Sequence, residues 1–208
     1  MPDAPAKEGL RERKKRAARA AIAATARRLF AERGFEAVTV AEVAAAAQVS
    51  EKTVFNYFPT KVDLAFAGRE EGIAGVVAAI RERPPGRSIL EVFRGITHGV
   101  LDVVVAGDED LYAVARILRG SRTLQERLSV GWEPGADAIA SAISGGADDL
   151  VAGIVARTLW FTHRSIFRAA LLGLLEEEEP AALAARLRVA ADAAYDQLAA
   201  GLADYGRG

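Results

Sequence analysis

Residues 39–61 read TVAEVAAAAQVSEKTVFNYFPTK, and this stretch decides the fold. Thr39 is placed to cap a first short helix, and Glu42 three residues later completes a capping box. Ser50 is placed to cap a second short helix. Pro59 ends that helix, because the residue before a proline avoids helical backbone angles. Two short helices joined by a tight turn are the helix-turn-helix pattern, whose second helix can lie in the major groove of DNA.

The sequence on both sides of this stretch is also helical. Apolar residues at helical spacing predict a first helix over 10–33, which Gly34 ends as a C-cap. Thr60 and Asp63 begin a fourth helix expected over 61–83. Gly, Asp and Pro residues separate the further expected helices, which cover 88–106, 110–119, 121–144, 148–175 and 180–204. Side chains expected to close the core of the first three helices are Val43, Ala44, Ala47, Val49, Val54 and Phe58.

Two places leave the local structure open. Pro134 is expected either to break the segment 121–144 or to kink it. Val103–Val105 would also suit a short strand, but no partner strand is apparent. The fold class is therefore all-α, with an N-terminal three-helix helix-turn-helix domain and a larger C-terminal helical domain. We expect a disordered tail over residues 1–9, the DNA-binding domain over 10–60 and the second domain over 61–208.

Composition excludes several classes of protein. The 208 residues are 51% hydrophobic, which is enough for a core, and contain no cysteine, so no disulfide or thiolate chemistry is available. No apolar run of about 18 residues is present, and no signal-peptide core follows the basic N-terminus. These features suit a cytoplasmic protein.

The net charge of −1 hides an asymmetry that favours nucleic-acid binding. Residues 1–64 hold 12 Lys and Arg against 8 Asp and Glu, whereas residues 65–208 hold 15 against 20. Basic residues crowd the first twenty positions, at Lys7, Arg11, Arg13, Lys14, Lys15, Arg16 and Arg19. Alone, such an arm is as readily a solvated tail. Next to a helix-turn-helix, contact with DNA phosphates is the better interpretation.

The last two expected helices carry apolar faces suited to assembly. One interpretation is a four-helix bundle built from two helices of each of two chains. The other is that both faces cover the core of this chain. The residues predicted for a dimer interface are Leu159, Ile166, Leu183, Leu187, Ala191, Ala194 and Leu198.

Three sequence motifs resemble those of the tetracycline-repressor (TetR) family of bacterial transcription regulators. They are FAERGF at 30–35, TVAEVA at 39–44 and VSEKTVFNYFPTK at 49–61, and the similarity covers about residues 15–65. The resemblance implies a homodimer that binds a near-palindromic operator on double-stranded DNA. It also implies a C-terminal domain that binds a small molecule and dimerises through its last two helices. A repressor released by its effector is the main expectation; a regulator of the same shape without a small-molecule effector is the alternative.

Positions that match the family's DNA contacts follow from the same resemblance. They are Thr39, Val40, Ser50, Glu51, Lys52, Phe55, Asn56, Tyr57 and Lys61. Asn56 could pair with adenine and Lys52 with guanine, while Glu51 either accepts from cytosine or only favours the helix dipole. Gln48 stands where the family commonly has glycine, so a left-handed conformation there would cost about 1 kcal/mol.

No enzyme, cofactor or metal site is expected. The two histidines lack the three or four ligands of a zinc site, and no phosphate-binding or nucleophile motif occurs. An effector pocket between helices is the alternative use of these polar and aromatic side chains, although each is individually as consistent with core or surface. Its predicted lining is His98, Asp102, Arg116, Trp132, Trp160, His163 and Phe167. Arg116 would favour an anionic ligand, but a salt bridge to Asp102 or Asp110 explains it equally well.

Overall fold

The computed structural model describes residues 9–130 and 133–202, and the described residues form helices and connecting turns without a strand. The chain divides into two compact units, Met1–Ala67 and Gly68–Gly208. The expected all-α fold is confirmed. Val103–Val105 lie inside a helix, so no strand forms there. None of the described helices combines the length and apolar content needed to cross a membrane.

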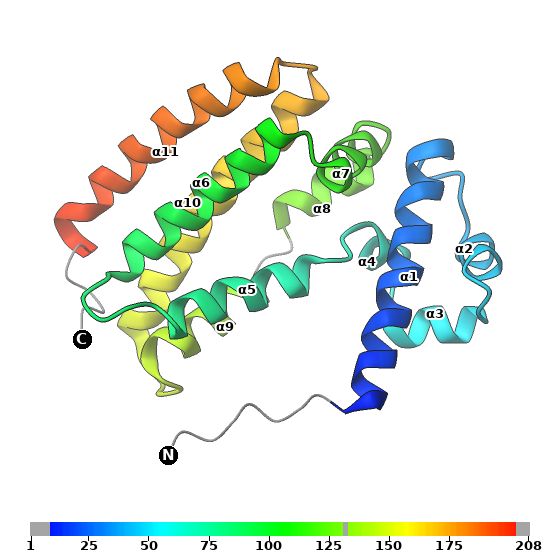
Figure 1. The fold of residues 1–208 in the computed structure, drawn as a ribbon, viewed down its shortest axis with the longest axis horizontal. Coiled ribbons are helices and arrows are strands. Elements are labelled where there is room, and N and C mark those ends of the chain that lie inside the picture. Colours follow the sequence, from blue (N-terminus) through cyan, green and yellow to red (C-terminus); the bar gives the residue numbers. More distant parts are fainter. Residues whose placement is uncertain (1–8, 131–132, 203–208) are drawn as a thin grey trace. The chain divides into compact units, whose positions relative to one another are not determined.

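The described part of the first unit contains four helices: α1 (Leu10–Arg33), α2 (Val40–Ala46), α3 (Glu51–Tyr57) and α4 (Lys61–Ala65). Helix α1 packs against α2 and α4, and α2 packs against α3 (Figure 1). The core side chains come from all four helices and from the turn after α1, and they include Ile22, Ala26, Phe30, Phe35, Val43, Val54, Phe58 and Leu64. Gly34 ends α1 with φ +86°, and its N–H donates to the Phe30 carbonyl, as the sequence predicted.

The second unit contains α5 (Arg69–Arg81), α6 (Ile89–Ala106), α7 (Glu109–Arg119), α8 (Arg122–Val130), α9 (Glu133–Ser144), α10 (Leu150–Leu175) and α11 (Pro180–Leu202). Helix α10 is its centre, because it packs against α6, α7, α9 and α11. Buried residues from α5, α6, α9, α10 and α11 form one hydrophobic core that surrounds Phe93, Leu159 and Tyr195.

The expected fourth helix over 61–83 is wrong, because the chain forms two helices there. Helix α4 ends at Ala65, and α5 begins after Gly68, whose φ of +100° is left-handed. Glycine adopts this conformation at little cost. A residue in this conformation cannot be part of a continuous right-handed helix, so the helix is interrupted here. Because α4 packs on α1, the first unit extends to Ala67 and not to residue 60.

The segment expected over 121–144 also forms two helices, α8 and α9. Pro134 lies in the first turn of α9, where the missing N–H of a proline would have no helical partner. The interpretation of a break at this proline is therefore confirmed. Residues 131 and 132, which include the predicted effector residue Trp132, lie outside the described residues.

Candidate functional site

Capping interactions fix both short helices of the helix-turn-helix. The Glu42 N–H donates to Thr39 Oγ1 at 3.2 Å, and Glu42 accepts in return from the Thr39 N–H at 2.7 Å. Arg33 at the end of α1 adds an ion pair to Glu42 at 2.6 Å. The Thr39 N–H and then the Arg33 guanidinium lower the pKa of Glu42 to about 2. The predicted capping box is confirmed, and it also joins α2 to α1.

The turn between α2 and α3 depends on one residue in an unusual conformation. Gln48 has φ +57°, the left-handed region that the sequence predicted at this position. Its N–H donates to the Ala45 carbonyl at 3.1 Å, and the Val49 N–H donates to the Ala44 carbonyl at 3.0 Å. Ser50 then caps α3 by accepting from the Thr53 N–H at 3.1 Å. These contacts set the direction in which α3 leaves the turn.

Helix α3 is divided into a buried side and an exposed side. Val54 and Phe58 are buried in the unit core, and Tyr57 is half-buried. Four predicted DNA-contacting side chains are exposed together, namely Glu51, Lys52, Phe55 and Asn56. Phe55 is 46% exposed although it is a large apolar residue. A helix face that meets only solvent rarely carries an exposed aromatic ring, so this face of α3 is a candidate binding surface.

The remaining predicted DNA contacts have other partners within the unit. Thr39 and Ser50 are exposed and use their hydroxyls in the caps, and Val40 is half-buried. Lys61 donates from Nζ to the Glu36 carbonyl at 3.3 Å and lies 4.4 Å from the centre of the Phe35 ring. Burial lowers the pKa of Lys61. The lysine therefore holds the turn after α1, and a role at phosphate stays a prediction.

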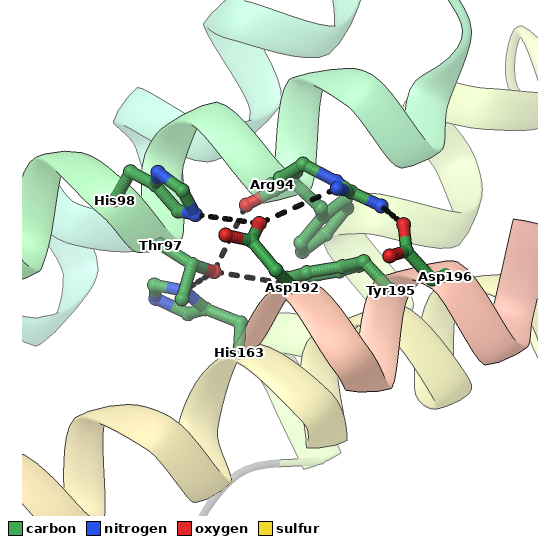
Figure 2. Close-up of polar contacts among 8 residues, drawn as sticks. Arg94, Thr97, His98, His163, Asp192, Tyr195 and Asp196 are labelled. Carbon is green, nitrogen blue, oxygen red and sulfur yellow. Dashed lines mark hydrogen bonds and ion pairs between the residues drawn. The ribbon is translucent and has the colours of Figure 1, made fainter. Parts of the chain in front are cut away.

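In the second unit, a buried polar group joins three helices (Figure 2). Thr97 Oγ1 on α6 lies 2.9 Å from His163 Nδ1 on α10 and 2.8 Å from the Tyr195 hydroxyl on α11. The Thr97 hydroxyl also donates to the Phe93 carbonyl at 2.9 Å. With that proton used, Tyr195 and His163 Nδ1 both donate to Thr97, which is consistent with a neutral imidazole. We call Thr97, His163 and Tyr195 the inner polar group.

Burial determines the protonation of the inner polar group. Desolvation, with a smaller effect of the Arg164 charge, lowers the pKa of His163 to about 4. Desolvation raises the pKa of Tyr195 to about 12, against the effects of Thr97 and Arg94. The Trp160 ring stacks on His163 with centroids 5.5 Å apart. At neutral pH this region is therefore aromatic and uncharged but able to form hydrogen bonds.

An outer layer of charges closes the α6–α11 contact above the inner polar group (Figure 2). Arg94 on α6 reaches Asp192 at 3.3 Å and Asp196 at 2.5 Å on α11. His98 Nε2 lies 3.0 Å from the same Asp192. One turn further along α6, Asp102 accepts from Arg188 at 2.5 Å. The predicted effector residues His98 and Asp102 thus contact α11.

The structure brings together only some of the predicted effector residues. Trp160 and His163 are in contact, and Phe167 is half-buried one turn further along α10. Arg116 is exposed on α7, outside the network of Figure 2. An open polar depression of about 500 Å³ is lined by Arg119, Gly120, Arg122, Gln125 and Glu126, and none of these described lining residues is a predicted effector residue. Sequence reasoning missed Thr97, Tyr195, Arg94 and Asp192, because their partners are far away along the chain.

The predicted dimer residues are mostly buried within their own unit. Leu159, Leu183, Leu187 and Ala191 are at most 3% exposed. Ile166, Ala194 and Leu198 are half-buried, and Leu198 packs against the core. Large exposed apolar side chains occur on the opposite faces of the same two helices, at Leu150, Val151, Ile154, Phe161 and Val189. Four of the seven predicted residues therefore belong to the core of this chain, and a dimer interface through the seven stays a prediction.

The described residues hold no group of three or more His, Cys, Asp or Glu side chains that could bind a metal ion. What the helices do present is a capped helix-turn-helix with an exposed reading helix, followed by a helical second unit. That combination is typical of helix-turn-helix transcription regulators.

Comparisons with known proteins find a family match over part of the chain. Residues 22–67 match the family model described as bacterial regulatory proteins, tetR family. The chain is 33% identical over 100 residues to the HTH-type transcriptional regulator TcmR of Streptomyces glaucescens, a match that covers 48% of this chain and 44% of that protein. The chain thus spans less than half the length of this relative. Residues 22–67 therefore form an N-terminal domain of the tetR-family type.

Solved structures share the fold at low sequence identity. The TetR-family repressor FadR of Thermus thermophilus, in complex with lauroyl-CoA, is 23% identical with a TM-score of 0.50, over 83% of this chain and 92% of that one. SmeT, in a complex with triclosan, is 20% identical with a TM-score of 0.54, over 88% of this chain and 90% of that one. These likenesses confirm a helical C-terminal domain of the same kind.

Proposed function

We propose that the protein is a dimeric repressor that binds a near-palindromic operator through α3 and releases it when a small molecule binds the second unit. The observation that carries the proposal is the exposed face of α3, where Lys52, Phe55 and Asn56 lie together. Ser50 caps the start of α3, and Thr60 caps the helix that follows it. Lys52 suits guanine O6 or N7, and Asn56 suits adenine. As part of this proposal the protein works in the cytoplasm, where a bacterial operator lies.

A second copy of the chain is the partner expected on the outer faces of α10 and α11. Ile154 and Phe161 are 57% and 68% exposed, and Val189 on α11 is 73% exposed. Large apolar side chains in such numbers on adjacent helices favour burial by another protein surface. Two chains joined there would present two α3 helices to successive major grooves, about 34–36 Å apart.

The proposed effector site is the region around Trp160, His163 and Phe167. Because His163 is neutral at pH 7, this region favours an uncharged ligand with an aromatic surface and a hydrogen-bonding group. Such a ligand would act on the contacts between α6, α10 and α11. It can weaken DNA binding only to the extent that its affinity differs between the two states of the protein.

A regulator without a small-molecule effector remains the second candidate function. The observation that favours it is the engagement of His98 and Asp102 by Asp192 and Arg188, which leaves these predicted effector residues in ion pairs with α11. In that case the network would serve only to hold the second unit together.

Asn56→Ala tests the DNA-reading role. The probe is a set of duplexes that cover the region upstream of the gene, with each base pair substituted in turn. The variant should lose about 1–3 kcal/mol of discrimination at one base pair per half-site and keep its preference elsewhere. The matched control is Gln197→Ala, which removes an exposed side-chain amide from α11 in the second unit. It should leave the preference at every base pair unchanged. Unchanged base preferences in Asn56→Ala would remove Asn56 as a reading residue, and absence of duplex binding by the unaltered protein would refute the proposal.

A further inference from the structure

The first ten residues of α1 are strongly basic. Residues 10–19 contain a single acidic residue, Glu12, and six cations at Arg11, Arg13, Lys14, Lys15, Arg16 and Arg19. Arg19 is half-buried, and the other five cations are exposed. We call this segment, residues 10–19, the basic overhang. The family model matches only from residue 22, so the basic overhang lies outside it.

One row of the helix shows how the basic overhang is placed. Ala23 is buried in the unit core with 4% exposure. Stepping back along the helix by four residues at a time reaches Arg19, then Lys15, then Arg11, each of which neighbours the next on the helix surface because four residues make about one turn. The row that begins at the core thus becomes cationic where the core ends. From Arg19 to Arg11 it runs about 12 Å further, at 1.5 Å per residue.

A direct contact ties the start of this row to the reading helix. The Arg19 guanidinium lies over the Phe58 ring, 4.8 Å from its centre. Phe58 directly follows α3, and its N–H donates to the Val54 carbonyl at 2.8 Å. Figure 1 shows that the dark blue start of α1 extends past α3 within the first unit. The basic overhang therefore leaves the unit next to the end of the helix that carries Lys52 and Asn56.

We propose that the basic overhang binds backbone phosphates of the DNA that flanks the base pairs read by α3. This inference rests on the proposed function. A row of cations beside a reading helix suits a polyanion, because each neutralised phosphate releases condensed counterions. A membrane surface is the poorer occupant, since Leu10 is the only large apolar residue in the sequence of the segment, and one such residue makes no apolar face for insertion.

The salt dependence of DNA binding tests this inference. The triple variant Arg11→Ala, Lys14→Ala and Lys15→Ala is compared with the unaltered protein on a duplex from the upstream region between 50 and 200 mM salt. Three lost phosphate contacts should reduce the slope of log K against log salt by about 2.7, because each contact contributes about 0.9. A slope equal to that of the unaltered protein would overturn the inference.

Two control proteins show whether a change in the salt slope comes from the basic overhang itself. The other possible causes are a loss of the folded structure and a change in the net charge of the protein. Arg81→Ala, Arg122→Ala and Arg127→Ala remove three exposed charges from the second unit and should leave the slope unchanged. The charge-preserving variant Arg11→Lys, Lys14→Arg and Lys15→Arg should keep the slope of the unaltered protein. If it loses the slope as well, positive charge in the basic overhang is not the cause, and the inference is wrong.

Shortening the duplex gives an independent test. The duplex is trimmed to the base pairs whose substitution changes affinity. This should lower the DNA affinity of the unaltered protein but not that of the triple alanine variant. Equal weakening of both would contradict the inference. If the unaltered protein ignores every duplex, the proposed function fails together with this inference. If Asn56→Ala alters base preference while the basic overhang has no effect on slope or length dependence, only the inference fails.

Discussion

At the scale of single residues, burial sets the behaviour of His163. It is 8% exposed, and Thr97, Trp160 and Phe93 surround its ring. Its pKa falls to about 4 because desolvation disfavours the charged imidazole. Below pH 6.5 the unfolded chain binds a proton that the folded chain does not. The stability contributed by neutral His163 is therefore complete above pH 6.5 and is lost as pH falls through about 4.

His163→Gln should reduce the pH dependence of the free energy of unfolding. For the unaltered protein, the His163 contribution to the free energy of unfolding should fall by about 2 kcal/mol between pH 7.5 and pH 5. Urea unfolding followed by tryptophan fluorescence measures it, since Trp160 stacks directly on the histidine. His98→Gln, at the half-exposed histidine of α6, is the control and should keep the pH dependence. Equal pH dependence in the unaltered protein and His163→Gln would contradict a buried neutral histidine.

At the scale of elements, local capping and turn chemistry explain the helix-turn-helix. Thr39, Ser50 and Thr60 each accept a backbone N–H of the helix that follows. Such caps contribute about 1 kcal/mol each and need only residues three positions apart. The left-handed turn at Gln48 is equally local. These elements were predictable from the sequence for that reason.

Gln48→Gly should stabilise the first unit by about 1 kcal/mol, because glycine adopts φ +57° without the strain of a side chain. Gln48→Val should destabilise it, since a β-branched residue is least suited to this conformation. Glycine introduced at a helical position, in the control variant Ala45→Gly, should lower the free energy of unfolding by up to about 1 kcal/mol. Thermal unfolding compares the three variants. Destabilisation by both glycine variants would argue against a strained turn.

At the scale of the whole molecule, assembly depends on side chains that the core does not use. Phe161→Glu and Ile154→Glu place charges on the exposed face of α10, so they should convert the proposed dimer to monomers and leave each chain folded. Val105→Glu, at an exposed apolar residue on α6, is the matched control and should stay dimeric. Analytical ultracentrifugation measures the state. A protein that is monomeric without any substitution, or a dimer unaffected by both variants, would refute this interface.

The sequence by itself determined the all-helical class, the capped helix-turn-helix and the exposed side of α3. These features depend on residues three to eight positions apart, whose spacing fixes caps, turns and helix faces. It did not determine the break at 66–68, because helical periodicity continues across it, whereas the structure shows a left-handed Gly68 after a short α4 that packs on α1.

Only the tertiary structure decided which faces of α10 and α11 are buried. Both helices carry apolar residues on two sides, so the sequence pattern could not distinguish a core face from a face for a second chain. The inner polar group likewise joins Thr97 to residues 66 and 98 positions away. Contacts over such separations follow from how the helices pack, and no local spacing encodes them.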